Sequence, residues 1–201
     1  SHKGYNKIYL LGFPKFFSNW LKLINNYKKY DLHGKYILIY SRESEHKYYM
    51  NKRIYNYLLI NAYESIRVKF PDHRIIIKVH PRENLNNIKY LIKEHNMNEV
   101  EVSAIHAGIL AKNAKLIISF WTSAILDSLA LDIPSIEFYK ETENFRILEP
   151  EGSLYKKVGI HTASNKQELM NFFDLVINKK YTQPKIIKEF KTIINLKCFE
   201  N

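Results

Sequence analysis

The chain has 201 residues, of which 46% are hydrophobic, and a formal net charge of +11. That length is enough for one main domain with a full core, without disulfides or metals to stabilise it. The lone Cys198 excludes an internal disulfide framework and a cysteine-rich zinc site, and it fits a reducing compartment. No run approaches the roughly 20 apolar residues of a membrane span, and the N-terminus lacks the layout of a signal peptide, so we expect a soluble, cytoplasmic chain.

The positive charge points to an anionic partner such as nucleic acid, a nucleotide or an acidic membrane surface. However, the 31 Lys and Arg residues are spread along the whole chain. They accompany abundant Asn, Ile and Tyr, as codon bias in an AT-rich genome would produce. We therefore expect no nucleic-acid binding, whereas peripheral contact of a basic face with the inner membrane stays open.

Apolar segments alternate with stretches of helical periodicity along most of the chain. This alternation predicts an α/β fold, a Rossmann-like parallel sheet with helices on both faces. Strands are expected at 7–11, 35–40, 74–79, 100–102, 116–119, 135–139 and 158–162. Helices are expected at about 48–70, from 85, at 104–114 with Ser103 as its cap, after 123, after a capping box at 164–168, and from Pro184, with a polar loop at 140–155.

We predict three parts: an N-terminal extension or interdomain segment at 1–34, a Rossmann-like domain at 35–180, and a C-terminal helix at 181–201. The aromatic residues between Phe16 and Ile24 are expected to pack on the main domain or on a neighbour outside the chain. Because the sequence starts at Ser1 without a Met, we expect a segment of a longer protein.

The glycine-rich nucleotide signatures are missing. The chain has only six glycines and contains neither GxGxxG nor GxxxxGK[ST], which argues against a dinucleotide fold and a P-loop enzyme. No histidines stand at metal-binding spacing with Cys or acidic partners. We therefore expect no cofactor and no metal.

Polar residues follow several of the predicted strands, where parallel sheets bind their ligands. An imidazole, guanidinium groups and hydroxyls at one such edge could hold a phosphate. Alternatively, Thr122 or Ser123 only caps the next helix, and the ring of His80 is satisfied at the end of its strand. The residues concerned are Arg42, His80, Pro81, Arg82, Ser119, Thr122 and Ser123.

Two of these stretches resemble a known family. KVHPRE at 78–83 and SFWTSAILDSLALDIPSIEF at 119–138 are similar to the C-terminal nucleotide-binding domain of GT-B glycosyltransferases. The closest likeness is to bacterial sialyltransferases and capsule or lipooligosaccharide transferases that use CMP-activated sugars, and it covers about 35–179. In that group an HP motif and a later Ser/Thr-Ser motif grip the donor nucleotide. They correspond here to His80-Pro81 and Thr122-Ser123.

The same resemblance implies an acidic residue on the following helix that holds the ribose. Asp127 stands there in place of the usual Glu, and its reach is shorter. Glu141 and Glu143 are alternative contacts to the ribose or sugar, or they are solvated surface residues.

The resemblance also implies a reaction: inverting transfer of a sialic acid or Kdo type sugar from a CMP-activated donor to a surface glycan or glycolipid. His80 would act as an acid toward the departing phosphate, and Arg82 and the hydroxyls would stabilise its charge. Arg42 would face the donor or the acceptor. The acceptor-side base would belong to a missing N-terminal GT-B domain, so we expect this chain to bind nucleotide without turnover.

Three other functions remain open at this point. A UDP-sugar transferase or epimerase would share the fold, and a CDP-glycerol type polymer transferase would also use a cytidine donor. A non-catalytic module that binds nucleic acid or lipid through its basic surface belongs to a different class.

Overall fold

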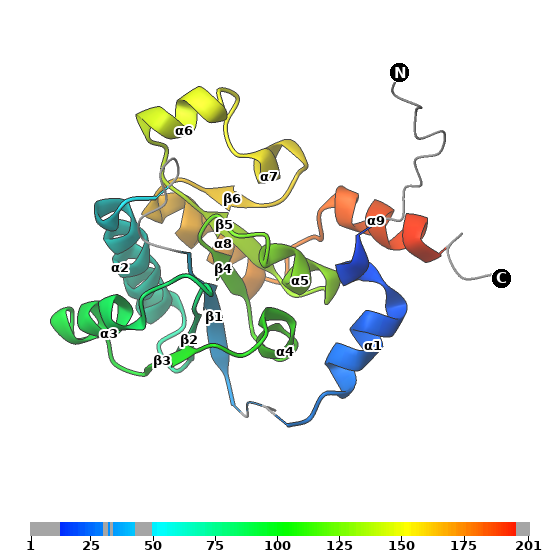
Figure 1. Cartoon of the computed structure of the whole chain (residues 1–201), viewed down its shortest axis with the longest axis horizontal. Coiled ribbons are helices and arrows are strands. Elements are labelled where there is room, and N and C mark those ends of the chain that lie inside the picture. The colour runs from blue at the N-terminus through cyan, green and yellow to red at the C-terminus, as the bar shows by residue number, and fades with distance from the viewer. Residues whose placement is uncertain (1–12, 30–31, 33, 43–49, 196–201) are drawn as a thin grey trace, which may run out of the picture.

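The computed structural model describes residues 13–29, 32, 34–42 and 50–195, and their centre is a parallel sheet (Figure 1). Its six strands are ordered β3-β2-β1-β4-β5-β6, and every neighbouring pair is parallel. The expected α/β class is therefore confirmed. The strands are β1 (Tyr36–Tyr40), β2 (Arg74–Lys78), β3 (Val100–Ser103), β4 (Ile117–Ser119), β5 (Ser135–Phe138) and β6 (Thr162–Ala163).

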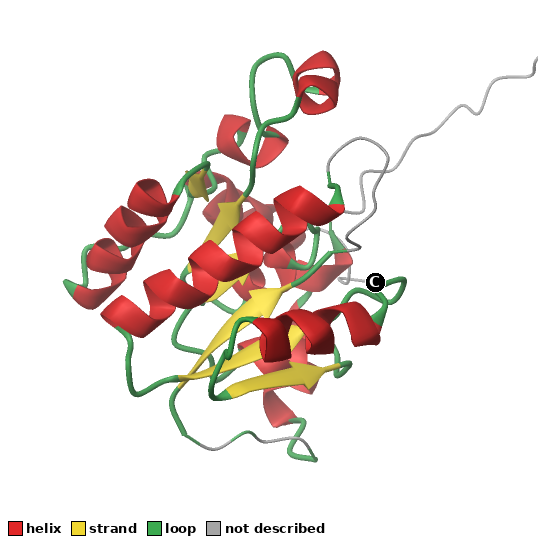
Figure 2. Cartoon of the chain, turned by 90° about the vertical axis from the view of Figure 1, so that its left-hand side faces the viewer, coloured by secondary structure: helices red, strands yellow, loops and turns green. Residues whose placement is uncertain are grey.

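Helices cover both faces of the sheet (Figure 2). One face carries α2 (Lys52–Lys69), α3 (Leu85–Glu94) and α8 (Lys166–Ile177), whose apolar residues share one core cluster with the strands. The other face carries α4 (Ala107–Ala111) and α5 (Ile125–Ala130). The remaining helices are η1 (Pro14–Phe16), α1 (Ser18–Asn26), α6 (Glu143–Leu148), α7 (Leu154–Lys157) and α9 (Lys185–Asn195).

The central strand shows why the sequence forms this sheet. All five residues of β1, Tyr36–Tyr40, are buried. Ile37 and Ile39 pack on the α2 side, while Leu38 packs on the α4 side, because successive side chains of a strand point to opposite faces. An unbroken apolar run is what a parallel strand covered on both faces requires.

The N-terminal aromatic stretch packs on this domain. Phe16 of η1 is only 2% exposed and shares a cluster with Ile125 and Leu129 of α5 and Ile187 of α9. Of the two expected locations, the structure therefore shows packing on the main domain. The strand expected at 7–11 lies outside the described residues.

The segment expected to be a polar loop, 140–155, contains helix α6 and the start of α7, so that expectation was wrong. Each helix has a local cap: Thr142 Oγ1 accepts a hydrogen bond from the Phe145 N–H at 2.9 Å, and Ser153 Oγ accepts one from the Tyr155 N–H at 3.1 Å. These caps satisfy N–H groups that the first turn leaves without a partner, which favours helix despite the polar composition.

Other boundaries also differ from the sequence-based expectation. The last strand is Thr162–Ala163 instead of 158–162, and the helix expected at 104–114 is shortened to Ala107–Ala111. His106 caps that helix in place of Ser103, because its Nδ1 accepts a hydrogen bond from the Gly108 N–H at 3.1 Å.

The capping box at the start of α8 is confirmed. The Glu168 N–H donates to Asn165 Oδ1 at 2.9 Å, and the Ser164 N–H donates back to Glu168 Oε2 at 2.7 Å. Within the part of the chain that the structure describes, no helix is long and apolar enough to cross a membrane.

Candidate nucleotide-binding site

The strand order reverses between β1 and β4, and open parallel sheets bind ligands outside the carboxyl ends of the strands at such a point. Arg42 follows β1 and the turn Ser119–Ser123 follows β4. His80 follows β2, the other neighbour of β1. The fold therefore brings three of the predicted segments to one edge of the sheet.

Arg42 joins two of these segments directly. Its Nη1 donates a hydrogen bond to the carbonyl oxygen of Trp121, in the turn after β4. The guanidinium is half-buried and spans from the end of β1 to the end of β4. This contact lies at the predicted edge, and the expectation that Arg42 faces donor or acceptor stays a prediction.

The tetrapeptide His80-Pro81-Arg82-Glu83 forms a hydrogen-bonded turn. The Glu83 N–H donates to the His80 carbonyl at 2.9 Å, and the Arg82 N–H donates to His80 Nδ1 at 3.3 Å. A neutral imidazole whose Nδ1 accepts a hydrogen bond carries its proton on Nε2. The turn therefore gives the His80 ring a defined donor, while Pro81 and Arg82 are exposed beside it.

The hydroxyl residues at the end of β4 and in the turn that follows differ in how far they are buried. Ser119 is fully buried and its Oγ donates to the Thr122 carbonyl at 3.3 Å, so it braces the turn from inside. Thr122 Oγ1 accepts a hydrogen bond from the Ala124 N–H at 3.3 Å within the turn, but the N-cap of α5 is Ala124 and has no side-chain cap, so the capping alternative was wrong. Ser123 is exposed. Contact between these hydroxyls and a phosphate stays a prediction.

Trp121, which the sequence reasoning did not single out, is the most unusual residue of this turn. Its φ is 50°, in the left-handed region that bulky residues rarely adopt. Its ring packs on Phe145 at 4.9 Å between ring centroids, and on Tyr139 and Tyr155 at 6.4 and 6.3 Å. These contacts compensate the backbone strain. The sequence does contain a signal for this aromatic cluster: aromatic residues stand just after β4, just after β5 and in the segment that follows β5.

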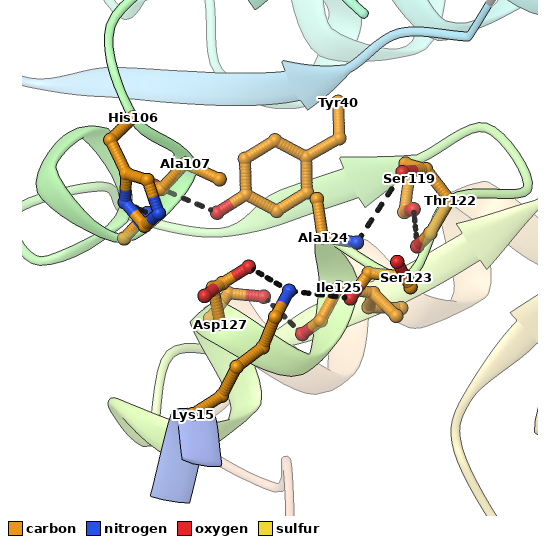
Figure 3. Close-up of polar contacts among 12 residues, drawn as sticks. Lys15, Tyr40, His106, Ala107, Ser119, Thr122, Ser123, Ala124, Ile125 and Asp127 are labelled. Atoms are coloured by element: carbon orange, nitrogen blue, oxygen red, sulfur yellow. Dashed lines mark hydrogen bonds and ion pairs between the residues drawn. The ribbon is translucent and has the colours of Figure 1, made fainter. Parts of the chain in front are cut away.

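Asp127, the predicted ribose contact, is paired with a lysine from the N-terminal segment (Figure 3). Lys15 Nζ lies 2.5 Å from Asp127 Oδ2 and also donates to the Ser123 carbonyl at 3.3 Å. The Asp127 side chain is 4% exposed, and its other oxygen, Oδ1, is buried without a hydrogen-bond partner among the described residues. The ion pair fastens η1 to α5, and the ribose contact stays a prediction.

The alternative acidic contacts lie on the segment after β5. Glu141 accepts a hydrogen bond from Arg146 Nε at 3.2 Å, and Glu143 stands exposed in the first turn of α6. Neither observation assigns them to a ligand.

A row of polar side chains crosses the sheet just below this edge. Lys78, Tyr40, Ser119 and Glu137 are aligned in register on neighbouring strands, so they project from the same face. Burial lowers the pKa of Lys78, and burial raises the pKa of Glu137 to about 8. The Ser153 hydroxyl donates to Glu137 Oε2 and links this row to α7.

This parallel sheet with helices on both faces is one half of the GT-B fold. The crystal structure of Methanocaldococcus jannaschii UDP-GlcNAc 2-epimerase in complex with UDP-GlcNAc and UDP superposes with a TM-score of 0.59 at 20% identity, covering 95% of this chain and 54% of that one. E. coli heptosyltransferase WaaC with ADP-2-deoxy-2-fluoro heptose gives a TM-score of 0.50 at 16% identity, covering 81% and 48%. The chain thus spans about half the length of these structures.

A third similar structure is the putative UDP-N-acetylglucosamine 2-epimerase of Listeria monocytogenes, with a TM-score of 0.50, 10% identity, and coverage of 87% of this chain and 46% of that one. No protein-family model and no curated protein sequence matches the chain. At these identities the likeness defines the fold.

Proposed function

We propose that this chain is the donor-nucleotide-binding half of a glycosyltransferase or a related nucleotide-sugar enzyme. The observation that carries the proposal is the meeting of three segments at the point where the strand order reverses: Arg42 after β1, the His80 turn after β2, and the hydroxyl turn after β4. The fold neighbours support it, since their structures contain UDP-GlcNAc, UDP or an ADP-heptose analogue.

The chemistry of these side chains suits a nucleotide phosphate. The Nε2–H of His80 donates a hydrogen bond, and the guanidinium groups of Arg42 and Arg82 supply permanent positive charge. When the glycosidic bond to the nucleotide breaks, the departing phosphate gains negative charge, and donors already in position stabilise it in the transition state. Thr122 and Ser123 would add hydroxyl donors, and Asp127 would contact the ribose.

The identity of the nucleotide is a finer question. The HP and Thr-Ser motifs favour CMP, with a sialic acid or Kdo type sugar and inverting transfer. The M. jannaschii epimerase structure holds UDP-GlcNAc and UDP, which favours a UDP-sugar enzyme as the second candidate. Calorimetric titration of the chain with CMP and with UDP separates them, because the correct base gives the tighter complex.

Other parts of the enzyme are expected outside these residues. In the proposed mechanism a second Rossmann-like domain supplies the base that activates the acceptor, a surface glycan or glycolipid. A glycolipid acceptor would bring the enzyme to the inner face of the membrane. Radiolabelled CMP-sialic acid should consequently not be turned over by the 201 residues alone.

Removing the imidazole tests the proposal. His80→Ala should weaken binding of the preferred nucleotide about tenfold, because a charge-assisted hydrogen bond to phosphate is lost. Titration calorimetry measures the affinity, and His95→Ala, an exposed histidine at the end of α3, is the matched control and should bind as the wild type does. Equal affinity of the His80→Ala variant and the wild type would contradict the role of His80, and no binding of either nucleotide to the wild type would contradict the proposed function.

A further inference from the structure

The carboxyl ends of β1 and β2 are joined by one carboxylate, Glu83. Its Oε1 accepts a hydrogen bond from Ser41 Oγ at 2.6 Å, immediately after β1. Its Oε2 accepts one from the backbone N–H of His80 at 2.9 Å, two residues after the end of β2. The two oxygens of a single side chain thus connect two of the segments that form the proposed nucleotide site.

This connection is anchored in the core of the domain. Ser41 is 2% exposed, and its Oγ lies 2.8 Å from the hydroxyl of Tyr55 on α2, itself 1% exposed. Burial raises the pKa of Glu83, while the hydrogen bonds from Ser41 and His80 lower it again. The hydrogen bonds of Ser41 therefore connect Glu83 to buried groups at the end of β1 and on α2.

Of the two residues that Glu83 bonds, His80 is itself a proposed ligand contact and Ser41 is next to one. Ser41 precedes Arg42, whose guanidinium reaches the turn after β4. The His80 N–H donates to Glu83, and within the same tetrapeptide the Arg82 N–H donates to His80 Nδ1, which fixes the ring proton on Nε2. A displacement of Ser41-Arg42 relative to the His80 turn would change the position of the guanidinium relative to the imidazole.

We propose that Glu83 is a positioning residue that holds Ser41-Arg42, after β1, and the turn at His80, after β2, in one arrangement, so that His80 and Arg42 face the same ligand. The identity of that ligand as a nucleotide rests on the proposed function. The arrangement itself can be tested in the nucleotide-free chain.

The test compares Glu83→Met with Glu83→Gln. Met has a similar length but no strong acceptor, so it removes the carboxylate oxygen to which the His80 N–H donates. Gln keeps a carbonyl oxygen for that N–H, and its NH₂ can donate to the Ser41 hydroxyl, which rotates to accept. The Gln variant should therefore restore what the Met variant loses. Glu94→Met, at an exposed glutamate of α3, controls for the substitution itself.

The primary readout is the ¹⁵N NMR signature of the His80 ring in the nucleotide-free chain. The wild type, Glu83→Gln and Glu94→Met should show one neutral tautomer with the proton on Nε2, and Glu83→Met should show a mixture of both tautomers. In the Met variant the dissociation constant of the preferred nucleotide should also rise about tenfold. A single unchanged tautomer in Glu83→Met overturns the inference.

Two further outcomes are informative. If the ring signature changes as expected while the wild type binds neither CMP nor UDP, the positioning role stands and the proposed function fails. If Glu83→Met does not fold, Ser41→Ala decides, since it removes only the β1 side of the connection. The Arg42 Nε–H signal should then shift while the His80 ring signal does not, and an unchanged Arg42 signal overturns the inference.

Discussion

Between pH 5 and pH 8 the free energy of unfolding of the wild-type chain should fall by about 4 kcal/mol relative to that of Glu137→Gln. Glu137 is fully buried, and burial raises its pKa to about 8. An unfolded glutamate titrates near its ordinary value of about 4.3. Between these two values the unfolded chain releases a proton that the folded chain keeps, so rising pH favours unfolding.

The sign and the limits of this effect follow from the same two pKa values. Below pH 4 both states hold the proton and the contribution of Glu137 to stability is complete. Well above pH 8 both states have lost it and the dependence ends. Chemical denaturation followed by tryptophan fluorescence at several pH values gives the free energies. Subtracting the free energy of unfolding of Glu137→Gln from that of the wild type at each pH removes the contributions of the other titrating groups. If the free energies of the two proteins change in parallel with pH, Glu137 is not a buried neutral carboxyl in the folded chain.

Glu137 is relevant to the candidate site because of its neighbours. It is aligned with Ser119 on β4, and the Ser153 hydroxyl that caps α7 donates to it. A carboxylate accepts this hydrogen bond more strongly than a neutral carboxyl does, and the bond accordingly lowers the pKa that burial raises. Since Tyr155 of α7 packs on Trp121, Glu137 is connected through α7 to the turn after β4.

Lys15→Met should lower the free energy of unfolding by about 3 kcal/mol, because it leaves the buried carboxylate of Asp127 without its counter-charge. Asp127→Asn should cost less, since a neutral amide is cheaper to bury than an unpaired charge. In the double variant the loss should be smaller than the sum of the two single losses. Urea denaturation of the single and double variants measures all three values.

The chain offers a matched control for this ion pair. Lys191 Nζ lies 2.5 Å from Asp132 Oδ2, the same separation as in the Lys15–Asp127 pair, and the two lysines are similarly exposed, at 28% and 30%. The acids differ, since the side chain of Asp132 is 68% exposed and that of Asp127 is 4% exposed. Lys191→Met should therefore cost less than about 1 kcal/mol. Equal losses for the two lysine variants would contradict the importance of burial at Asp127.

The α/β class and most element positions could be predicted from the sequence because they depend on local patterns. The apolar runs at 36–40 and 117–119 identify buried parallel strands, and the Asn165–Glu168 capping box identifies the start of α8. Helices α6 and α7 were missed, since a Glu-rich composition suggested a loop and the capping roles of Thr142 and Ser153 were overlooked.

The site was only partly predictable, for a different physical reason. The direction of the parallel strands predicts that the segments after them lie at one edge of the sheet. The common location of Arg42, His80 and the hydroxyl turn could therefore be anticipated. The ion pair between Lys15 and Asp127 joins residues far apart in sequence, and no periodicity announces it. The same holds for the connection from Glu83 to Ser41, which depends on the pairing of β1 with β2.

The most direct measurement is an amide NMR map of the ¹⁵N-labelled chain during titration with CMP and with UDP. Binding at the proposed site should shift the amides of 41–42, 80, 82–83 and 119–124, at the carboxyl edge of the sheet. The opposite edge offers a rival location, an open cavity of about 480 Å³ lined by Lys35, His73 and Lys115 among others. Shifts confined to the residues around that cavity, with the carboxyl edge unchanged, would contradict the proposed nucleotide site.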